Sequence, residues 1–540
     1  MADGKGGAFV AWRDQRDSAS TGYDIYAQRI DGAGVAQWTP NGVPVCSLPR
    51  DQINPHLVAD GADGVILAWQ DLRGGAHYDL YAQRIGPTGA LLWPAAGVRL
   101  RNSSFDQYLT SPPHSSIASD GAGGAIVAWS EYVTGTNTDV RAQRVDGSGA
   151  VRWTSYGVAV CTAVSFQDDP TLVSDGVGGV ILAWEDWRFW PVPHIYAQRL
   201  SASGQGQWAA DGIAGSSLAG DQRDPSLIPD EDGGALFAYQ DNRQGDHNVY
   251  AQRVDAMGQF RWAADGVPLC TAPGPQSRPS LAGDGGGGAV VAWEDGRSNP
   301  SCVGGCYWDV YAQHVDATGV PQWTPDGVGL STAEDDQEQP RLVGDGAGGT
   351  IAVWADSRGF LTDQIYGQHL DPLGTPQWAP DGVALTSGGG SPRQWGPVAV
   401  TDGAGGAIVV WTDNRGGACG VDGCFPTDLY AAPVTSSGPL AVPGPGAPAL
   451  RLLAPHPNPM ATTTSIGFSL PTARRLTVEI FDLTGQRVRT LASGREYPAG
   501  THTLSWEGRT DAGRALPSGV YVLRLSTAGA TERRKIVLLR

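Results

Sequence analysis

The residues best suited to recognition chemistry in this sequence are aromatic side chains in segments of varying length. They are Trp187, Phe189, Trp190, Tyr307, Trp308, Phe360, Trp395 and Phe425, with His194 closely following the first three. Exposed aromatic rings stack on sugars or on apolar groups of a protein, so these residues are candidates for binding a protein or glycan ligand. The alternative is that the same rings only pack against neighbouring parts of the fold.

Residue patterns of known catalytic machinery are missing from the sequence. There is no serine nucleophile elbow, no His-Glu-x-x-His pair and no phosphate-binding loop, and the nine histidines are scattered. Arginines are distributed along the chain rather than concentrated. We therefore predict a non-catalytic protein with no cofactor, and keep a glycan-processing enzyme as an alternative.

Cysteines occur in two close pairs and three single positions. The pairs lie in the segments CVGGC and CGVDGC, at Cys302 with Cys306 and at Cys419 with Cys424. A metal site would need further ligands that neither segment offers, so we predict local disulfides, which indicate an oxidising compartment. Cys46, Cys161 and Cys270 recur at one repeat position and are expected to be buried small side chains.

A repeated unit, represented by residues 170–212, positions the segments that carry the candidate aromatic residues and the cysteine pairs. It contains four extended segments, a to d, separated by glycine-rich turns and loops. The aromatic residue near the end of segment b recurs eight times, at Trp12, Trp69, Trp129, Trp184, Tyr239, Trp293, Trp354 and Trp411. Four-stranded units repeated about every 55–60 residues predict an all-β, eight-bladed β-propeller with incomplete first and last repeats. A seven-bladed ring with one partial repeat is the alternative.

Several polar residues recur with the unit and are therefore assigned to structure. An Asp-x-Arg pair follows segment b in seven copies, represented by Asp186 and Arg188, and a glutamine recurs in segment c, represented by Gln198. We expect ion pairs and hydrogen bonds that hold the loops. Asp-Gly-x-Gly-Gly turns begin at Asp120, Asp175, Asp345 and Asp402. Hairpin geometry explains these turns without a metal, and calcium binding is the alternative.

The loops between segments b and c vary from copy to copy, whereas the a–b and c–d turns stay short. In an up-and-down blade the b–c and d–a connections emerge on the same face of the ring. One face is therefore uniform and the other diversified, and binding sites are usually built on variable loops of a rigid scaffold. The candidate aromatic residues belong to this variable face.

Charge separates the chain into two parts. The chain has 37 basic and 55 acidic residues, and the part from Arg451 onward holds 13 basic and 6 acidic ones. The strongly acidic first part argues against nucleic acid and anionic membranes as partners. No apolar run is long enough to span a membrane, and no signal peptide is visible at Met1.

The last part of the chain differs in composition and lacks the repeat. We predict a propeller over 1–442, a Pro/Gly-rich linker over 443–450 and a small β-sandwich over 451–540. This last region resembles the FlgD-type Ig-like domain and the C-terminal sorting domain of type IX secretion substrates. The resemblance rests on segments containing Asn458, Pro459, Gly485, Gly519, Tyr521 and Lys535. It implies export to the bacterial surface or medium, with the export machinery as a partner.

Together these features predict an extracellular or surface propeller that binds a protein or glycan through its variable face. A second hypothesis is a structural surface or filament subunit, in which the incomplete first blade accepts a strand from another molecule. The glycan-processing enzyme is the third.

Overall fold

The computed structural model covers residues 1–540 and describes most of them. The residues outside this description are 17–21, 102, 104, 111–114, 136, 231, 299–306, 359–362, 387–392, 415–427, 440–450, 453–457, 459, 461, 471–473, 483–485, 498–499, 528–530 and 540. The predicted disulfide cysteines, Phe360, Phe425, Pro459 and Gly485 all lie outside it.

The chain divides into two compact units, residues 1–440 and 441–540. All regular elements of the described residues are strands, and none of those residues forms a helix that could cross a membrane. The predicted linker limits at 442 and 450 stay predictions, because residues 440–450 are outside the description.

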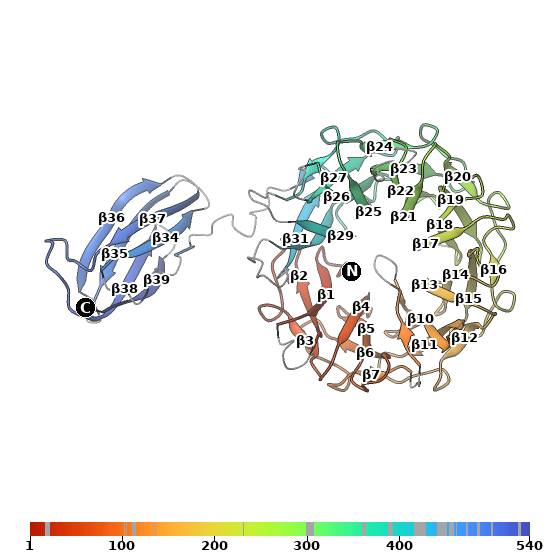
Figure 1. The fold of residues 1–540 in the computed structure, drawn as a ribbon, viewed down its shortest axis with the longest axis horizontal. Coiled ribbons are helices and arrows are strands. Elements are labelled where there is room, and N and C mark those ends of the chain that lie inside the picture. Colours follow the sequence, from red (N-terminus) through yellow and green to blue (C-terminus); the bar gives the residue numbers. More distant parts are fainter. Residues whose placement is uncertain are drawn as a thin grey trace. The chain divides into compact units, whose positions relative to one another are not determined.

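The first unit is a ring of eight antiparallel sheets, which confirms the predicted propeller (Figure 1). In blades 2 and 4 to 8 the strands follow one another in the order a, b, c, d across the sheet. Strands a form the inner edge of the ring, where β4, β13, β17, β21, β25 and β29 are seen in Figure 1.

The strands of the first four blades have the following bounds. Blade 1 contains β1 (Ala8–Asp14), β2 (Asp24–Ile30) and β3 (Val43–Cys46). Blade 2 contains β4 (Gln52–Ala59), β5 (Val65–Asp71), β6 (Asp79–Ile85) and β7 (Val98–Arg99). Blade 3 contains β8 (Gln107–Tyr108), β9 (Ile117–Ser119), β10 (Ala125–Thr134), β11 (Asn137–Val145) and β12 (Val158–Cys161). Blade 4 contains β13 (Gln167–Ser174), β14 (Val180–Asp186), β15 (His194–Leu200) and β16 (Ile213–Ala214).

The other four blades each have four strands. Blade 5 contains β17 (Gln222–Pro229), β18 (Ala235–Asp241), β19 (Asn248–Val254) and β20 (Val267–Cys270). Blade 6 contains β21 (Gln276–Gly283), β22 (Ala289–Asp295), β23 (Asp309–Val315) and β24 (Val328–Ser331). Blade 7 contains β25 (Gln337–Gly344), β26 (Thr350–Asp356), β27 (Gln364–Leu370) and β28 (Val383–Ala384). Blade 8 contains β29 (Gln394–Thr401), β30 (Ala407–Asp413), β31 (Asp428–Thr435) and β32 (Gly438–Pro439).

Two blades depart from the four-strand plan. Among the described residues, blade 1 has three strands, and an isolated bridge joins Ala2 to Ala8 at the start of β1. In blade 3, strand a is split into β8 and β9, which pair with different parts of β10.

The core lies between the sheets and is built by strands b and c. In β5, β14, β18, β22 and β26 every residue is buried, as the β-branched and aromatic runs predict. Trp184 is fully buried, and its ring edge leaves so little room that a Cβ on Gly212 would lie 2.6 Å from it. Gly212 also has a φ of +87°, so glycine is required there by space and by backbone conformation.

The second unit is a two-sheet β-sandwich. One sheet has β33 (Arg451–Leu452), β34 (Thr464–Leu470) and β37 (Gly500–Trp506), and the other has β35 (Arg474–Phe481), β36 (Arg487–Tyr497), β38 (Gly519–Ser526) and β39 (Thr531–Leu538). The edge strand β36 has few apolar residues, and its pairing with β35 shifts register three times. Ile466, Phe468, Trp506 and Leu523 are fully or almost fully buried between the sheets.

Four residues of the predicted sorting motif are described by the structure. Two of them stabilise the sandwich through their side chains, and the other two lie on its strands. The Asn458 side chain donates to the carbonyl of Lys535 at 2.8 Å and accepts from the N–H of Val537 at 2.8 Å, which ties it to β39. Tyr521 packs edge-on against Trp506 and donates its hydroxyl to the carbonyl of Pro517. Gly519 begins β38, and Lys535 is exposed on β39.

Candidate functional site

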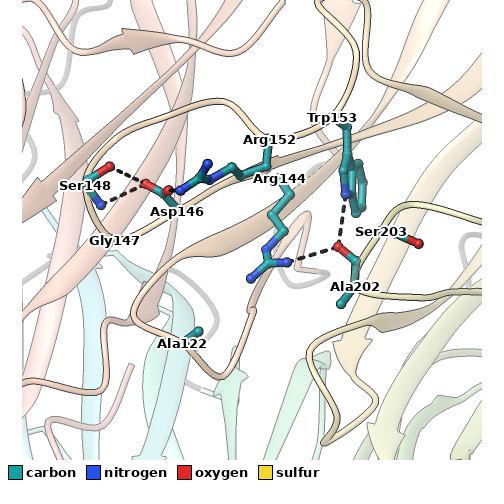
Figure 2. Close-up of a pocket in the computed structure, with 9 residues that line it drawn as sticks. All are labelled: Ala122, Arg144, Asp146, Gly147, Ser148, Arg152, Trp153, Ala202 and Ser203. Atoms are coloured by element: carbon teal, nitrogen blue, oxygen red, sulfur yellow. Dashed lines mark hydrogen bonds and ion pairs between the residues drawn. The ribbon is translucent and has the colours of Figure 1, made fainter.

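One cavity of the ring is lined by a contact that recurs at other blade boundaries (Figure 2). It has a volume of about 730 Å³ and lies between blades 3 and 4 at the short-turn face. Arg144 and the indole N–H of Trp153 both donate to the carbonyl of Ala202 in the next blade, at 3.0 and 3.2 Å. The same two-donor contact recurs at Arg84 with Trp93, Arg199 with Trp208, and Arg253 with Trp262. A contact repeated at successive blade boundaries indicates a structural role.

The Asp-x-Arg pairs are structural too, as predicted. In blade 4, Asp186 accepts from the indole N–H of Trp184 at 2.9 Å and from Arg188 Nε at 2.8 Å. The Arg188 guanidinium lies 3.8 Å from the centre of the Tyr196 ring. Equivalent ion pairs join Asp14–Arg16, Asp71–Arg73, Asp241–Arg243, Asp295–Arg297 and Asp356–Arg358. Arg415, in the seventh pair, is outside the described residues.

The strand c glutamines and the Asp-Gly turns also have internal partners. Gln198 donates to the carbonyl of Ala209 and accepts from the N–H of Trp208. In the turn at Asp120, one carboxylate oxygen accepts from the N–H groups of Ala122 and Gly124 and the other accepts from Arg144. Backbone and arginine donors therefore account for this turn without calcium. No group of three or more His, Cys, Asp or Glu side chains suited to a metal occurs among the described residues.

The variable face of blade 4 carries an aromatic patch, which we define as Phe166, Trp187, Phe189, Trp190 and His194. The ring centroids of Trp187 and Trp190 are 5.4 Å apart, and those of Phe189 and His194 are 5.8 Å apart. Trp190 is 65% exposed and Phe189 59% exposed. Four predicted candidates thus come together, and two of them present most of their surface to solvent.

The other described candidates lie on other blades. Tyr307 is 48% exposed and precedes Trp308 in blade 6, where the N–H of Trp308 donates to Asp336 at 3.0 Å. Trp395 lines a cavity of about 370 Å³ between blades 7 and 8, together with Glu338, Gln339, Arg393 and others. These residues are not part of the blade 4 patch.

The inner strands contain a feature that the sequence analysis missed. Each of six strands a begins with Gln-x-x-Pro, and the residue before the proline has a positive φ within a β-bulge. These residues are Asn54, Asp169, Asp224, Arg278, Gln339 and Gly396. The glutamine and the proline repeat from blade to blade, whereas the residue before the proline varies. This variation is the sequence signal that could have marked the position as a candidate for function.

In blades 4 and 5 these bulges gather a carboxylate cluster, which we define as Asp168, Asp169, Glu185 and Asp224. Glu185 is buried and accepts a hydrogen bond from the backbone N–H of Asp224 at 3.0 Å. Asp224 accepts from the Gln240 amide at 2.9 Å, and Asp168 accepts from the Thr138 hydroxyl at 2.9 Å.

The carboxyl groups of the cluster all hold protons more strongly than usual. Burial, and then the charges of Asp224 and Asp169, raise the pKa of Glu185 to about 8. Desolvation and the charges of Asp168 and Asp224 raise the pKa of Asp169 to about 6. Desolvation also raises the pKa values of Asp168 and Asp224. Carboxyl groups with displaced pKa values are typical of functional sites, although structural clusters produce them as well.

Arg223 connects the aromatic patch to the carboxylate cluster. Its guanidinium lies 5.0 Å from the centre of the Trp187 ring and forms two hydrogen bonds with Asp221, at 2.6 and 2.8 Å. Glu185 and Asp224 are close enough to help raise its pKa, after Asp221. Phe166 of the patch also directly precedes β13, which carries Asp168 and Asp169. Arg223 therefore contacts the exposed aromatic patch and lies near two buried carboxyl groups of the cluster.

Comparison with known proteins identifies part of the chain. Residues 460–530 match the family model of the FlgD Ig-like domain, which confirms the resemblance in the second unit. No curated protein matches the chain.

Solved structures that match the chain are propeller-type proteins. A protein of unknown function from Dyadobacter fermentans has 10% identity and a TM-score of 0.34, covering 63% of this chain and 94% of its own. An α-L-arabinanase from Penicillium chrysogenum has 13% identity and a TM-score of 0.33, covering 72% and 94%. An α-L-arabinofuranosidase from Fusarium graminearum has 12% identity and a TM-score of 0.29, covering 75% and 98%. At these identities the likeness concerns the fold alone.

These matches correct one prediction. The sequence analysis predicted that the chain is not an enzyme, and this is contradicted because matching propellers include an arabinanase and an arabinofuranosidase. The absence of familiar motifs does not exclude catalysis, because pairs of catalytic carboxyl groups in glycosidases have no fixed sequence spacing. The likeness by itself assigns no substrate to this chain.

Proposed function

We propose that the ring binds a glycan at the joined aromatic patch and carboxylate cluster of blades 4 and 5. The observation that carries the proposal is the contact of Arg223 with Trp187 on one side and its proximity to Glu185 and Asp224 on the other. Aromatic faces stack on the apolar faces of sugar rings, while carboxyl and guanidinium groups bond to sugar hydroxyls. A protein ligand would use the exposed rings but would not account for the adjacent carboxyl groups.

Binding can be tested with a glycan array followed by titration of the glycans retained. Trp190→Ala is expected to weaken binding about tenfold, which corresponds to 1.4 kcal/mol. Because Trp190 is 65% exposed, the melting temperature should change little. Met257→Ala is a matched control, since Met257 is 81% exposed in a turn of the uniform face. Equal binding by the Trp190 variant and the wild type would refute the proposed site.

Hydrolysis of a glycosidic bond is the second candidate function. It is favoured by the raised pKa of Glu185, because a carboxyl group that stays protonated near neutral pH can donate a proton to a leaving oxygen. An ionised neighbour in the cluster would serve as the base or the nucleophile. The test is release of new reducing ends from the glycans that bind. Glu185→Gln should bind them and release none, whereas product formation by this variant would exclude Glu185 as the acid.

We also propose that the protein is exported and that the second unit is the signal for its export. This proposal is supported by the match of residues 460–530 to the FlgD Ig-like domain, the region where the sorting-domain motifs were predicted. We expect the protein at the bacterial surface or in the medium. Removing residues 441–540 in a host with type IX secretion should retain the ring inside the cell envelope. Unchanged export of the shortened protein would contradict this part of the proposal.

A further inference from the structure

The cavity between blades 7 and 8 lies at the variable face, apart from the glycan site proposed on blades 4 and 5. Its volume is about 370 Å³, and its lining includes Glu338, Trp395, Asp363, Arg393 and Asn414. Ligand pockets of proteins begin at about 300 Å³, so the cavity is large enough for a small organic group.

Two side chains that other blade boundaries contain are replaced by small residues at this boundary. After the tryptophan of strand b, blades 4 and 6 have Glu185 and Glu294, whereas blade 7 has Ala355, which lines the cavity. At the positive-φ position of strand a, blade 8 has Gly396, and a Cβ built there would meet no atom within 4 Å. Space that larger side chains occupy at other boundaries is therefore open between blades 7 and 8.

The backbone beside the cavity keeps its hydrogen bond by another route. At the boundary of blades 6 and 7, Glu294 accepts from the N–H of Gln339 at 2.8 Å. Ala355 has no acceptor in its side chain, and the N–H of Gly396 donates instead to Oε1 of Gln339 at 3.1 Å. The bulge of blade 8 is therefore stabilised without a carboxyl group at position 355, and the space stays available to a ligand.

Two charged groups of the lining neutralise each other. Nε of Arg393 donates to Asp363 at 2.8 Å. The Ser357 hydroxyl donates to the other carboxylate oxygen of Asp363 at 2.9 Å. Asp363 and Arg393 therefore leave little net charge to attract a ligand.

Glu338 supplies the uncompensated charge of the cavity. Within the described part of the chain, no donor forms a hydrogen bond or an ion pair with its carboxylate, and Arg278 pairs with Glu294 at 3.1 Å instead. Burial, and then the charges of Glu294 and Asp336, raise the pKa of Glu338. A positive charge in the cavity would remove this unfavourable environment of the carboxylate.

Trp395 adds an aromatic surface to the same cavity. It follows the glutamine of strand a, at the position that Asp168 and Arg223 occupy in blades 4 and 5. Its side chain is partly exposed. The face of an indole ring attracts cations and packs on alkyl groups. The cavity thus combines an unpaired carboxylate with an indole ring.

We propose that the cavity between blades 7 and 8 binds an organic cation, a guanidinium or ammonium group at the end of an alkyl chain. The Glu338 carboxylate would neutralise the charge of the cation, and the Trp395 ring would stack on the cation and its alkyl chain. A neutral ligand would leave the charge of Glu338 uncompensated, so charge complementarity favours the cation.

The probe is n-butylguanidinium, titrated into the protein of residues 1–540 by calorimetry. Its control is n-butylurea, which has nearly the same shape and no charge. We expect one saturable site for the cation and at least tenfold weaker binding of the urea. Equal binding of the two compounds, or no binding of the cation at millimolar concentration, would overturn the proposal.

Three variants of the protein locate the binding. Glu338→Gln keeps the shape of the side chain and removes its charge, so it should weaken binding of the cation at least tenfold. Ala355→Gln fills the cavity with the side chain that Gln70 and Gln240 carry at the equivalent position, and it should abolish binding. Glu334→Gln is the matched control, because Glu334 is exposed and does not line the cavity, and its binding should equal that of the wild type.

Thermal melting checks that each variant is folded. Glu338→Gln adds no volume, so it tests the site even where Ala355→Gln does not fold. Undiminished binding by a folded Glu338→Gln variant would refute the role of the carboxylate and with it the proposal.

A blocked glycyl-arginyl-glycine peptide identifies the source of the cation. Binding as tight as that of n-butylguanidinium, or tighter, would assign the cavity to an arginine side chain of a partner protein. Weaker binding of the peptide would assign it to a free small cation. Both results support the cation site and differ in the molecule that carries the charge.

Discussion

The backbone N–H of Asp224 donates a hydrogen bond to Oε1 of Glu185, 3.0 Å away, across the boundary between blades 5 and 4. A buried carboxyl group of one blade thus holds the bulge of the next in its positive-φ conformation. Glu294 has the same relationship with the N–H of Gln339, at 2.8 Å. Glu185 and Glu294 therefore each hold a backbone N–H of the next blade. Whether either carboxyl group can also bind a ligand or transfer a proton depends on the charged groups around it.

Glu185 is expected to make the ring less stable as pH rises. Its pKa is raised to about 8, whereas the same group in the unfolded chain titrates near 4.5. The unfolded state therefore loses its proton first, and the free energy of unfolding falls as pH rises from about 4.5 to 8. Glu185→Gln keeps an acceptor oxygen and should be more stable than the wild type at pH 8, by about 2 kcal/mol or more, with little difference at pH 4.5. Urea unfolding at both pH values measures this, and a difference independent of pH would contradict it.

His56 is expected to sensitise the protein to acid. Its Nε2 lies 2.9 Å from the carbonyl of Thr110, and its Nδ1 accepts from the N–H of Ser116 at 3.3 Å. Burial lowers its pKa to about 4. Below about pH 6.5 the unfolded chain binds a proton that the folded ring excludes, so about 3 kcal/mol of stability is lost by pH 4.

The substitution His56→Thr tests this prediction, because blade 4 has a threonine, Thr171, at the equivalent position. The variant should show a shallower loss of stability between pH 6.5 and 4 in urea unfolding. Above pH 7.5 the two proteins should differ by a constant amount. Parallel curves over the acidic range would show that His56 is not the group responsible.

The ion pair of Asp186 and Arg188 is expected to be worth far more than a surface pair. Asp186 is fully buried, and Arg188 also donates to the carbonyl of Asp211 at 2.8 Å. Arg188→Ala leaves an unpaired buried charge and should cost about 3 kcal/mol in the free energy of unfolding. Arg152→Ala is the control, because the Arg152 side chain in its pair with Asp146 is 57% exposed, and it should cost less than about 1 kcal/mol. Similar costs for both variants would refute the distinction.

The equivalent tryptophans of blades 1 and 4 are expected to differ in their contributions. Trp184→Ala empties a fully buried site and should cost about 3–5 kcal/mol. Trp12 is partly exposed, so Trp12→Ala should cost at least 1 kcal/mol less. Chemical denaturation of the two variants makes the comparison. Equal costs would contradict the expected difference in burial.

Much of the ring could be predicted from the sequence because its framework repeats. Trp184, Asp186, Arg188 and Gln198 occupy equivalent places in most copies, and such repetition assigns them to packing and hydrogen bonding before any coordinates are known. Four of the five residues of the aromatic patch were predicted as candidates, and Phe166 was not. The disulfide pairing and the binding roles of these residues stay predictions.

The carboxylate cluster could not be foreseen by the same reasoning. Asp169 and Asp224 precede prolines in strands that otherwise resemble their sisters, and nothing in their spacing shows that a bulge gives both a positive φ. Glu185 follows Trp184, whose position holds an aromatic residue in every blade, so the sequence gives no reason to separate Glu185 from the framework. Proximity across a blade boundary depends on the closure of the ring, which lies beyond local sequence pattern.

The three-stranded blade 1 also has a mechanical consequence. The core between blades 8 and 1 has three buried residues, Ala8, Ile30 and Ile408, whereas the core joining blades 1 and 2 has ten. A closed ring must break at one boundary before any blade can separate, and the boundary with the smallest core has the lowest barrier. Under heat or force the ring should therefore open at the boundary between blades 8 and 1 before it opens between blades 1 and 2.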